Sequence, residues 1–170
     1  MGFLRQFAGC LAALLLTGCA GYRLGPTNDL AAGAKSIQLG PFANQTMEPR
    51  LGDAFTTAMR RQVQQDGTYH LATHGAADVV VTGVLKTYNR YELAFVPKDV
   101  LTVSDYHVSL TAQITAHDTS TGKILFDQQV TGNTLIRVGS DLTSAERQAL
   151  PQLADDLARN VTALLVDGNW

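Results

Sequence analysis

A strict alternation of apolar and polar side chains over residues 105–118 is the clearest pattern in the chain. Successive side chains of a strand point to opposite faces, so the pattern predicts a long β-strand with one buried face. The apolar positions are Tyr106, Val108, Leu110, Ala112, Ile114 and Ala116, and the polar positions are His107, Ser109, Thr111, Gln113, Thr115 and His117. Turn residues at 118–122 predict a hairpin to an antiparallel strand over residues 123–133.

Two segments before this hairpin also have strand character. Residues 35–39 alternate, with Ile37 and Leu39 on one face, and the Gly-Pro pair at 40–41 is expected to end this first strand. Residues 78–85 are rich in valine and apolar on both faces, which is typical of a central strand. The chain therefore supplies at least four strands.

Other segments between the elements leave alternatives open. Residues 42–46 are expected to form a loop, and residues 69–73 a short extended segment. The strand at 78–85 has room to continue to Asn89. Residues 89–104 then form either a hairpin tip or a long loop between two strands.

Helical periodicity replaces the alternation in two places. The first helix runs to about residue 65, with Pro49 in its first turn and an Asp-Gly pair at 66–67 as its end. Its apolar stripe is Leu51, Phe55, Ala58, Met59 and Val63. One apolar stripe on an otherwise polar helix predicts that a single side packs on the core.

The second helix reaches about Val166. Thr143 and Glu146 have the spacing of a capping box at its start. Because Pro151 falls inside the segment, the helix either kinks there or begins only near Leu150. Its apolar positions include Ala149, Leu150, Leu153, Leu157, Val161, Leu164 and Leu165.

These elements predict an α+β fold. Each amphipathic helix needs an apolar surface, and one sheet with both helices on the same face satisfies both. We therefore expect a two-layer α/β sandwich, in which a four-stranded, mostly antiparallel sheet carries the two helices on one face. The other face of that sheet is then left open.

The first residues have the features of a bacterial lipoprotein signal. Arg5 is followed by an apolar run over 7–16, which is the length of a signal peptide core and too short to span a bilayer. Leu16-Thr17-Gly18-Cys19 then reads as a lipobox. We expect a signal peptide at 1–18, a lipidated anchor and tether at 19–34, and a single domain at 35–170. The alternative is a signal peptide cut elsewhere, with Cys19 as an ordinary thiol.

Lipidation of Cys19 would attach the mature protein to a membrane without spanning it, because several acyl chains together anchor firmly. The next residue is Ala20 rather than the aspartate that retains lipoproteins at the inner membrane in the enterobacterial sorting pattern. This predicts an outer-membrane protein on the periplasmic side. Gly21-Tyr22-Arg23-Leu24 follows, either docking on a barrel or the bilayer interface, or serving as a linker.

Composition narrows the class of protein further. The 170 residues include 13 Lys and Arg against 15 Asp and Glu, for a formal charge of −2. This balance lacks the basic footprint of a nucleic-acid binder. Of the two cysteines, Cys10 would leave with the signal peptide and Cys19 would be modified. The mature domain is therefore expected to depend on its core for stability.

The polar side of the strand at 105–118 is unusual because it has no Lys, Arg or Glu. Uncharged hydrogen-bonding side chains suit a wet protein–protein contact, so we expect this face to bind a partner. The predicted partner face is His107, Ser109, Thr111, Gln113 and Thr115. The alternative is a solvated face whose threonines simply favour a strand.

No catalytic or metal-binding constellation is visible, so we expect neither an enzyme nor a cofactor. His107 and His117 lie at opposite ends of one strand, about 33 Å apart, and cannot share a metal. Ser104 and His107 point to opposite faces of that strand and have no nucleophile elbow beside them.

Basic side chains near the predicted strand tips are a candidate binding cluster for lipid phosphates. These residues are Lys86, Arg90 and Lys98. Lys and Arg both form strong, charge-assisted hydrogen bonds to phosphate. The alternative is that they are ordinary solvated charges.

The chain resembles the lipopolysaccharide-assembly lipoprotein family LptE in several short motifs. Each motif alone is weakly specific, and their order along the chain carries the resemblance. The motifs are Gly21-Tyr22-Arg23-Leu24 after Cys19, Ser36-Ile37-Gln38-Leu39, the segment 42–49, Ala77-Asp78, Thr121-Gly122-Lys123 and the closing helix. The resemblance implies two helices on a four-stranded sheet. It also implies a lipoprotein seated as a plug in the LptD β-barrel, which helps to insert lipopolysaccharide into the outer leaflet and binds it.

We therefore expect a non-enzymatic outer-membrane lipoprotein with LptD and lipopolysaccharide as partners. The alternative is a periplasm-facing scaffold lipoprotein that recruits another cell-envelope complex. A lipid-anchored hydrolase is disfavoured, because the sequence offers no nucleophile–base pair.

Overall fold

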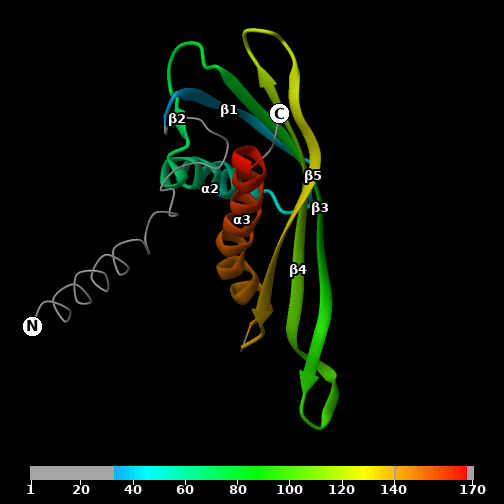
Figure 1. Ribbon diagram of the computed structural model, residues 1–170. Helices are drawn as coiled ribbons and strands as arrows, with labels where there is room; N and C mark the ends of the chain where they lie inside the picture. The colour runs from blue at the N-terminus through cyan, green and yellow to red at the C-terminus, as the bar shows by residue number, and fades with distance from the viewer. Residues whose placement is uncertain (1–32, 140, 168–170) are drawn as a thin grey trace, which may run out of the picture.

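The structure, a computed structural model, describes residues 33–139 and 141–167. A single twisted sheet forms one layer, and helices α2 (Leu51–Asp66) and α3 (Leu142–Asp167) cover one face of it (Figure 1). The predicted α+β class and the two helices on one face are therefore confirmed. The predicted signal peptide, Cys19 and the tether up to residue 32 lie outside the described residues.

The sheet has five strands rather than the four expected. They are β1 (Lys35–Asn44), β2 (Tyr69–Leu71), β3 (Val79–Val96), β4 (Asp99–Asp118) and β5 (Ile124–Arg137), in the order β2-β1-β3-β4-β5. The count was wrong because the short extended segment after α2 pairs with β1 as an edge strand. The sheet is mixed, since β1 runs parallel to both neighbours while β3, β4 and β5 form an antiparallel meander.

Strand β1 does not end at the Gly-Pro pair, as predicted, but continues to Asn44 past an irregularity between Leu39 and Phe42. Proline is tolerated at such a bulge because its missing N–H breaks no ladder bond there. Beyond the bulge, residues 42–44 pair with residues 83–85 of β3. Phe42 also packs edge-to-face on Phe55 of α2, with ring centroids 4.9 Å apart.

Strands β3 and β4 are longer than the sequence predicted and pair down to Val96 and Asp99. Residues 89–104 therefore form a hairpin and not a long loop. Strand β5 also extends past residue 133, and its last pair joins Arg137 to Asp105. Charged and polar side chains obscured the alternation in these extensions.

Helix α2 agrees closely with its prediction, and its buried residues include all five of the predicted stripe. It ends at Gly67, whose φ of 74° lets its N–H donate to the Val63 carbonyl at 3.2 Å. Pro49, expected in the first turn, lies just before the helix, which begins at Leu51.

Helix α3 begins at Leu142 and continues through Pro151, so the later start near Leu150 was wrong. The predicted capping box is also absent. Instead the Asp141 carboxylate accepts hydrogen bonds from the backbone N–H groups of Thr143 at 3.1 Å and Ser144 at 2.9 Å. These bonds satisfy donors that the first helical turn leaves unpaired.

Helix α3 crosses the edge strand β5 at Gly132. A Cβ atom at this glycine would lie 2.5 Å from the Leu157 backbone nitrogen, so only glycine allows the approach. On either side of the crossing, the Asp156 carboxylate accepts from the Asn133 N–H and the Asn160 amide donates to the Thr131 carbonyl, both at 2.9 Å. Side chains of α3 thereby occupy backbone groups that an exposed edge would offer to another strand.

In the part of the chain that the structure describes, neither helix has the length and apolar character needed to cross a membrane.

Gly132→Ala should lower the free energy of unfolding by about 1–3 kcal/mol, because the methyl group forces α3 away from the sheet. Chemical denaturation measures the change. Gly139→Ala is the matched control, since a Cβ there meets no heavy atom within 4 Å. Equal effects of the two substitutions would contradict the role assigned to the crossing.

The fold should also lose stability in alkali through Tyr69, whose hydroxyl donates to the Leu165 carbonyl at 3.2 Å. Burial, and to a smaller degree the charge of Asp66, raises the pKa of Tyr69 to about 12. The unfolded chain releases this proton first, so stability is complete below about pH 10 and falls as the pH rises toward 12. Urea denaturation at about pH 9 and at about pH 12 gives the free energy of unfolding that each chain loses between the two pH values. This loss should be smaller in Tyr69→Phe than in the parent chain, by on the order of 2 kcal/mol. An unchanged loss would exclude Tyr69 as its source.

Candidate functional site

The sheet face opposite the helices carries the predicted partner residues. The alternation over residues 105–118 is confirmed, because Val108, Leu110, Ala112, Ile114 and Ala116 are buried under the helices. Their polar neighbours on β4 are half-buried and point to the other face. His107, Ser109, Thr111, Gln113 and Thr115 therefore share one surface, and the structure brings them together as a row.

The strand register places polar residues of β3 and β5 beside those of β4, in rows that run across the three strands. Thr87 of β3 and Thr131 of β5 lie opposite Thr111, and the Thr111 and Thr131 hydroxyls are 2.9 Å apart. The next row toward the β3–β4 turn, Asn89, Ser109 and Asn133, also consists of small polar residues. We call these two rows the polar ladder: Thr87, Asn89, Ser109, Thr111, Thr131 and Asn133. All six side chains can donate and accept hydrogen bonds, and none is charged.

On the side of the polar ladder that leads to the β4–β5 turn, the face carries a charge that the sequence analysis did not predict. Asp127 of β5 lies opposite Thr115 and accepts hydrogen bonds from the Gln113 amide at 2.5 Å and the Thr115 hydroxyl at 3.2 Å. The alternation of β4 alone suggested a face without charges. Asp127 shows that the face carries a carboxylate. The alternation within residues 123–133 was the signal that could have placed Asp127 there.

On the side that leads to the β3–β4 turn, the row after the polar ladder has aromatic and apolar side chains. His107 stacks on Tyr91 of β3 with ring centroids 6.5 Å apart, and Leu135 of β5 lies opposite it. Beyond this row, Arg137 donates to the Asp105 carboxylate at 3.1 Å. Toward the β3–β4 turn the outer face thus passes from the polar ladder to one row with aromatic and apolar side chains and then to an ion pair.

Arg90, predicted to contact lipid phosphate, is exposed and is paired with a carboxylate of the protein itself. Its guanidinium donates to both carboxylate oxygens of Glu146 on α3, at 3.2 and 3.1 Å, and lies 5.2 Å from the centroid of the Tyr106 ring. The Tyr88 hydroxyl also donates to Glu146. Burial, followed by this hydrogen bond, raises the pKa of Tyr88. The group fastens the hairpin to the start of α3.

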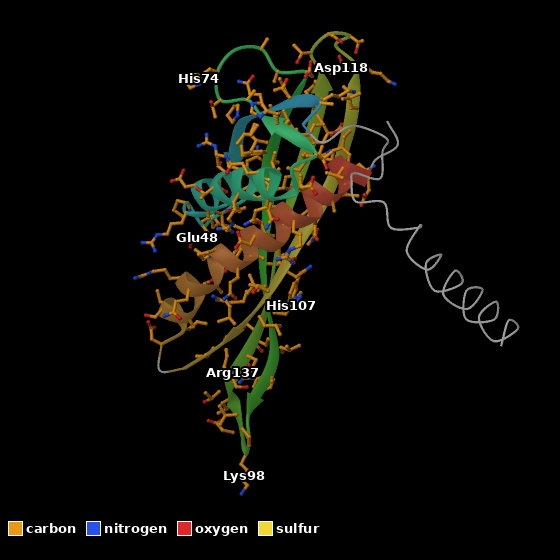
Figure 2. The ribbon with its side chains drawn as sticks, turned by 60° about the vertical axis from the view of Figure 1, so that its left-hand side comes forward. Glu48, His74, Lys98, His107, Asp118 and Arg137 are labelled. Atoms are coloured by element: carbon orange, nitrogen blue, oxygen red, sulfur yellow. The ribbon has the colours of Figure 1, made fainter. Side chains whose placement is uncertain are left out.

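Lys86 and Lys98 are exposed, and the structure does not bring them together with Arg90. Lys86 lies at an irregularity of β3, between Leu85 and Thr87. Lys98 forms the apex of the β3–β4 turn with a φ of 70°, at the far end of β4 from Asp118 (Figure 2). At about 3.3 Å per residue, the extended strand alone places Arg90 about 20 Å from the turn. The three predicted cations are therefore separate positions along one hairpin.

The remaining candidates form no catalytic group among the described residues. The Ser104 hydroxyl donates to Asp105 at 2.8 Å and not to a histidine. Within residues 33–139 and 141–167, no three acidic, histidine or cysteine side chains are close enough to share a metal ion.

Comparison with known proteins assigns a family. The family model LptE, described as lipopolysaccharide-assembly, matches residues 34–165. No curated protein sequence gives a significant match.

Solved structures share the fold at low sequence identity. A protein from Xanthomonas campestris is 10% identical, with a TM-score of 0.62 over 86% of this chain and 91% of that one. A hypothetical protein from Chlamydia trachomatis is 12% identical, with a TM-score of 0.59 over 81% and 98%. A minor lipoprotein from Acinetobacter baumannii is 15% identical, with a TM-score of 0.51 over 78% and 93%.

Arg90→Ala should lower the free energy of unfolding by about 1 kcal/mol, because it removes an ion pair and a cation–π contact that hold the hairpin to α3. Lys98→Ala should stay within about 0.5 kcal/mol of the parent chain. Chemical denaturation of both variants measures the difference. If Arg90→Ala keeps the free energy of unfolding of the parent chain, the contacts of Arg90 do not stabilise the fold, and Arg90 is an ordinary solvated cation.

Proposed function

The chain belongs to the LptE lipopolysaccharide-assembly family, and on that premise we propose that it is an outer-membrane lipoprotein that acts as plug and assembly partner of the LptD β-barrel. In this role it assists the transport of lipopolysaccharide to the outer leaflet. Acylation of Cys19, after removal of residues 1–18, would hold it at the periplasmic side of that membrane.

The observation that carries the proposal is the polar ladder. The lumen of a transmembrane barrel is polar, so a plug needs a surface rich in hydrogen-bonding groups and poor in charges that would lose their hydration. Thr111 and its row provide that surface over three adjacent strands. A face of this kind suits a wet contact, in which water bridges polar groups of the two proteins.

The β5 edge of the sheet is partly covered, which favours contact with the barrel through the open sheet face rather than through the edge. Because Asp156 and Asn160 occupy backbone groups of β5, this stretch of the edge is not available to extend the strands of a barrel. The protein would therefore sit in the lumen as a separate folded body. Its contribution is structural: it fills the lumen and supports the fold of the barrel.

The proposal also includes direct contact between the protein and lipopolysaccharide. Lys86 and Lys98 are exposed cations that can reach phosphate groups, while Arg90 is already paired with Glu146. We assign direct phosphate contact to the two lysines. Arg90 would act indirectly, by keeping the hairpin that carries Lys98 in place.

Thr111→Arg should weaken retention of LptD, because it puts a large charge into the centre of the polar ladder. The measurement is a pull-down of the tagged protein from detergent-solubilised outer membranes, with the co-purified barrel quantified by mass spectrometry. The parent chain should retain the barrel in stoichiometric amount.

Thr57→Arg is the matched control, since Thr57 is exposed on α2, away from the sheet face. Circular dichroism must first show that both variants are folded. Equal retention of the barrel by both would remove the sheet face from the interface. Absence of any barrel with the parent chain would refute the plug role and favour a scaffold for another envelope complex.

A further inference from the structure

A pocket of about 500 Å³ lies at the edge of the sheet, where the short strand β2 ends (Figure 1). Gln38 and Leu39 of β1 form one wall, Arg60 and Gln64 of α2 form the second, and residues 71–74 form the third. No acidic residue lines the pocket, and Arg60 is its one permanent cation. The pocket therefore combines polar and apolar walls with a positive charge.

The pocket adjoins a stretch of β1 whose outer edge is not covered by another strand. Strand β2 pairs with β1 only as far as Ile37, whose carbonyl accepts from the Ala72 N–H at 2.8 Å. Backbone groups of alternate residues in a strand point to the same side, so the Leu39 N–H and C=O face this edge beyond the end of β2. No backbone group of residues 72–78 bonds to them. An open edge of this kind can accept another extended segment.

The open stretch of β1 is short. The strand is irregular between Leu39 and Phe42, and Pro41 within this irregularity has no N–H to donate. An incoming segment can therefore pair with Leu39 but cannot continue in register along β1. The last residue of an extended polypeptide meets this limit, because its chain ends where the pairing must end.

The charge at the pocket selects the same occupant. Arg60 is exposed and has no ion-pair partner among the described residues, whereas its neighbour Arg61 is paired with Asp155 of α3. A C-terminal carboxylate is a planar anion, which a guanidinium binds through two parallel hydrogen bonds. Leu39 and Leu71 are half-buried and supply an apolar surface for the last side chain of the bound segment.

The pocket lies at the end of the domain where the described chain begins. A neighbouring pocket of about 320 Å³ shares Gln64 and Leu71 with it and is also lined by Gly33. The predicted tether from Cys19 would therefore join the domain close to this edge. The polar ladder belongs to the sheet face opposite the helices, so the pocket and the proposed barrel contact use different surfaces.

We propose that this pocket binds the free C-terminus of a partner polypeptide. The last residues of the partner add as a short extended segment to the edge of β1 at Leu39, and their carboxylate binds Arg60. Phosphate groups and lipids have no peptide backbone to pair with Leu39, so the site distinguishes a chain end from other anions. The inference goes beyond the proposed function and does not depend on a barrel partner.

The test selects ligands for the full chain, purified in detergent, from a library of short random peptides displayed with free C-termini. Peptides should be enriched on the parent chain and on Arg147→Glu, but not on Arg60→Glu. Arg147 is the matched control, because it is exposed on α3, has no ion-pair partner among the described residues and lies outside the pocket. Circular dichroism must show that both variants are folded.

An enriched peptide is then synthesised with a free C-terminus and as the C-terminal amide. The amide should bind more weakly by about tenfold or more, because it lacks the charge that Arg60 binds. Bound peptide should also slow amide hydrogen exchange at Leu39. Exchange of the Asn133 N–H should stay unchanged, since this group is already bonded to Asp156.

Four outcomes would overturn the proposal. They are no enrichment on the parent chain, equal enrichment on Arg60→Glu, equal affinity of the acid and the amide, and unchanged exchange at Leu39. Displacement of the peptide by an equal concentration of inorganic phosphate would also do so, because it would show a general anion site. The pull-down with Thr111→Arg tests another surface, so failure of the plug role gives a different result.

Discussion

The close approach of α3 to β5 at Gly132 determines how the two layers fit together. Because this glycine has no side chain, the Leu157 backbone can rest directly on the strand. The approach brings Asp156 and Asn160 to the edge of the sheet, where they bind its backbone groups. One small residue thus allows the helix both to cover the core and to close an edge. The opposite face then stays free of secondary structure in the described chain.

The two faces of the sheet therefore have different physical roles. The face under the helices supplies the core, and its strands contribute buried aliphatic side chains such as Leu110 and Ile114. The open face changes along its length, from the carboxylate of Asp127, through the uncharged hydroxyls and amides of the polar ladder, to the row of Tyr91, His107 and Leu135 and then to the Arg137–Asp105 ion pair. Because this change follows the strand direction, the two ends of the molecule present different side chains to their surroundings.

Local patterns predicted the parts of the fold that depend on neighbouring residues. The alternation around Leu110 and the stripe through Phe55 were sufficient for β4 and α2, because each pattern is set by the element's own geometry. Contacts between distant segments were not predictable in this way. Arg90 looked like a free cation because its partner, Glu146, lies 56 residues away. Asp127 reaches the open face through strand register, and β2 is too short to have a recognisable period.

The parallel pairing of β1 has a consequence for the order in which the chain acquires structure. Strands β3, β4 and β5 follow one another through short turns, so their contacts close small loops of chain. Strand β1 instead inserts between β2 and β3 after α2 has intervened, which requires a much longer loop to close. The meander is therefore expected to form first, and β1 to join last. Until then β3 presents an open edge, to which another extended segment could pair.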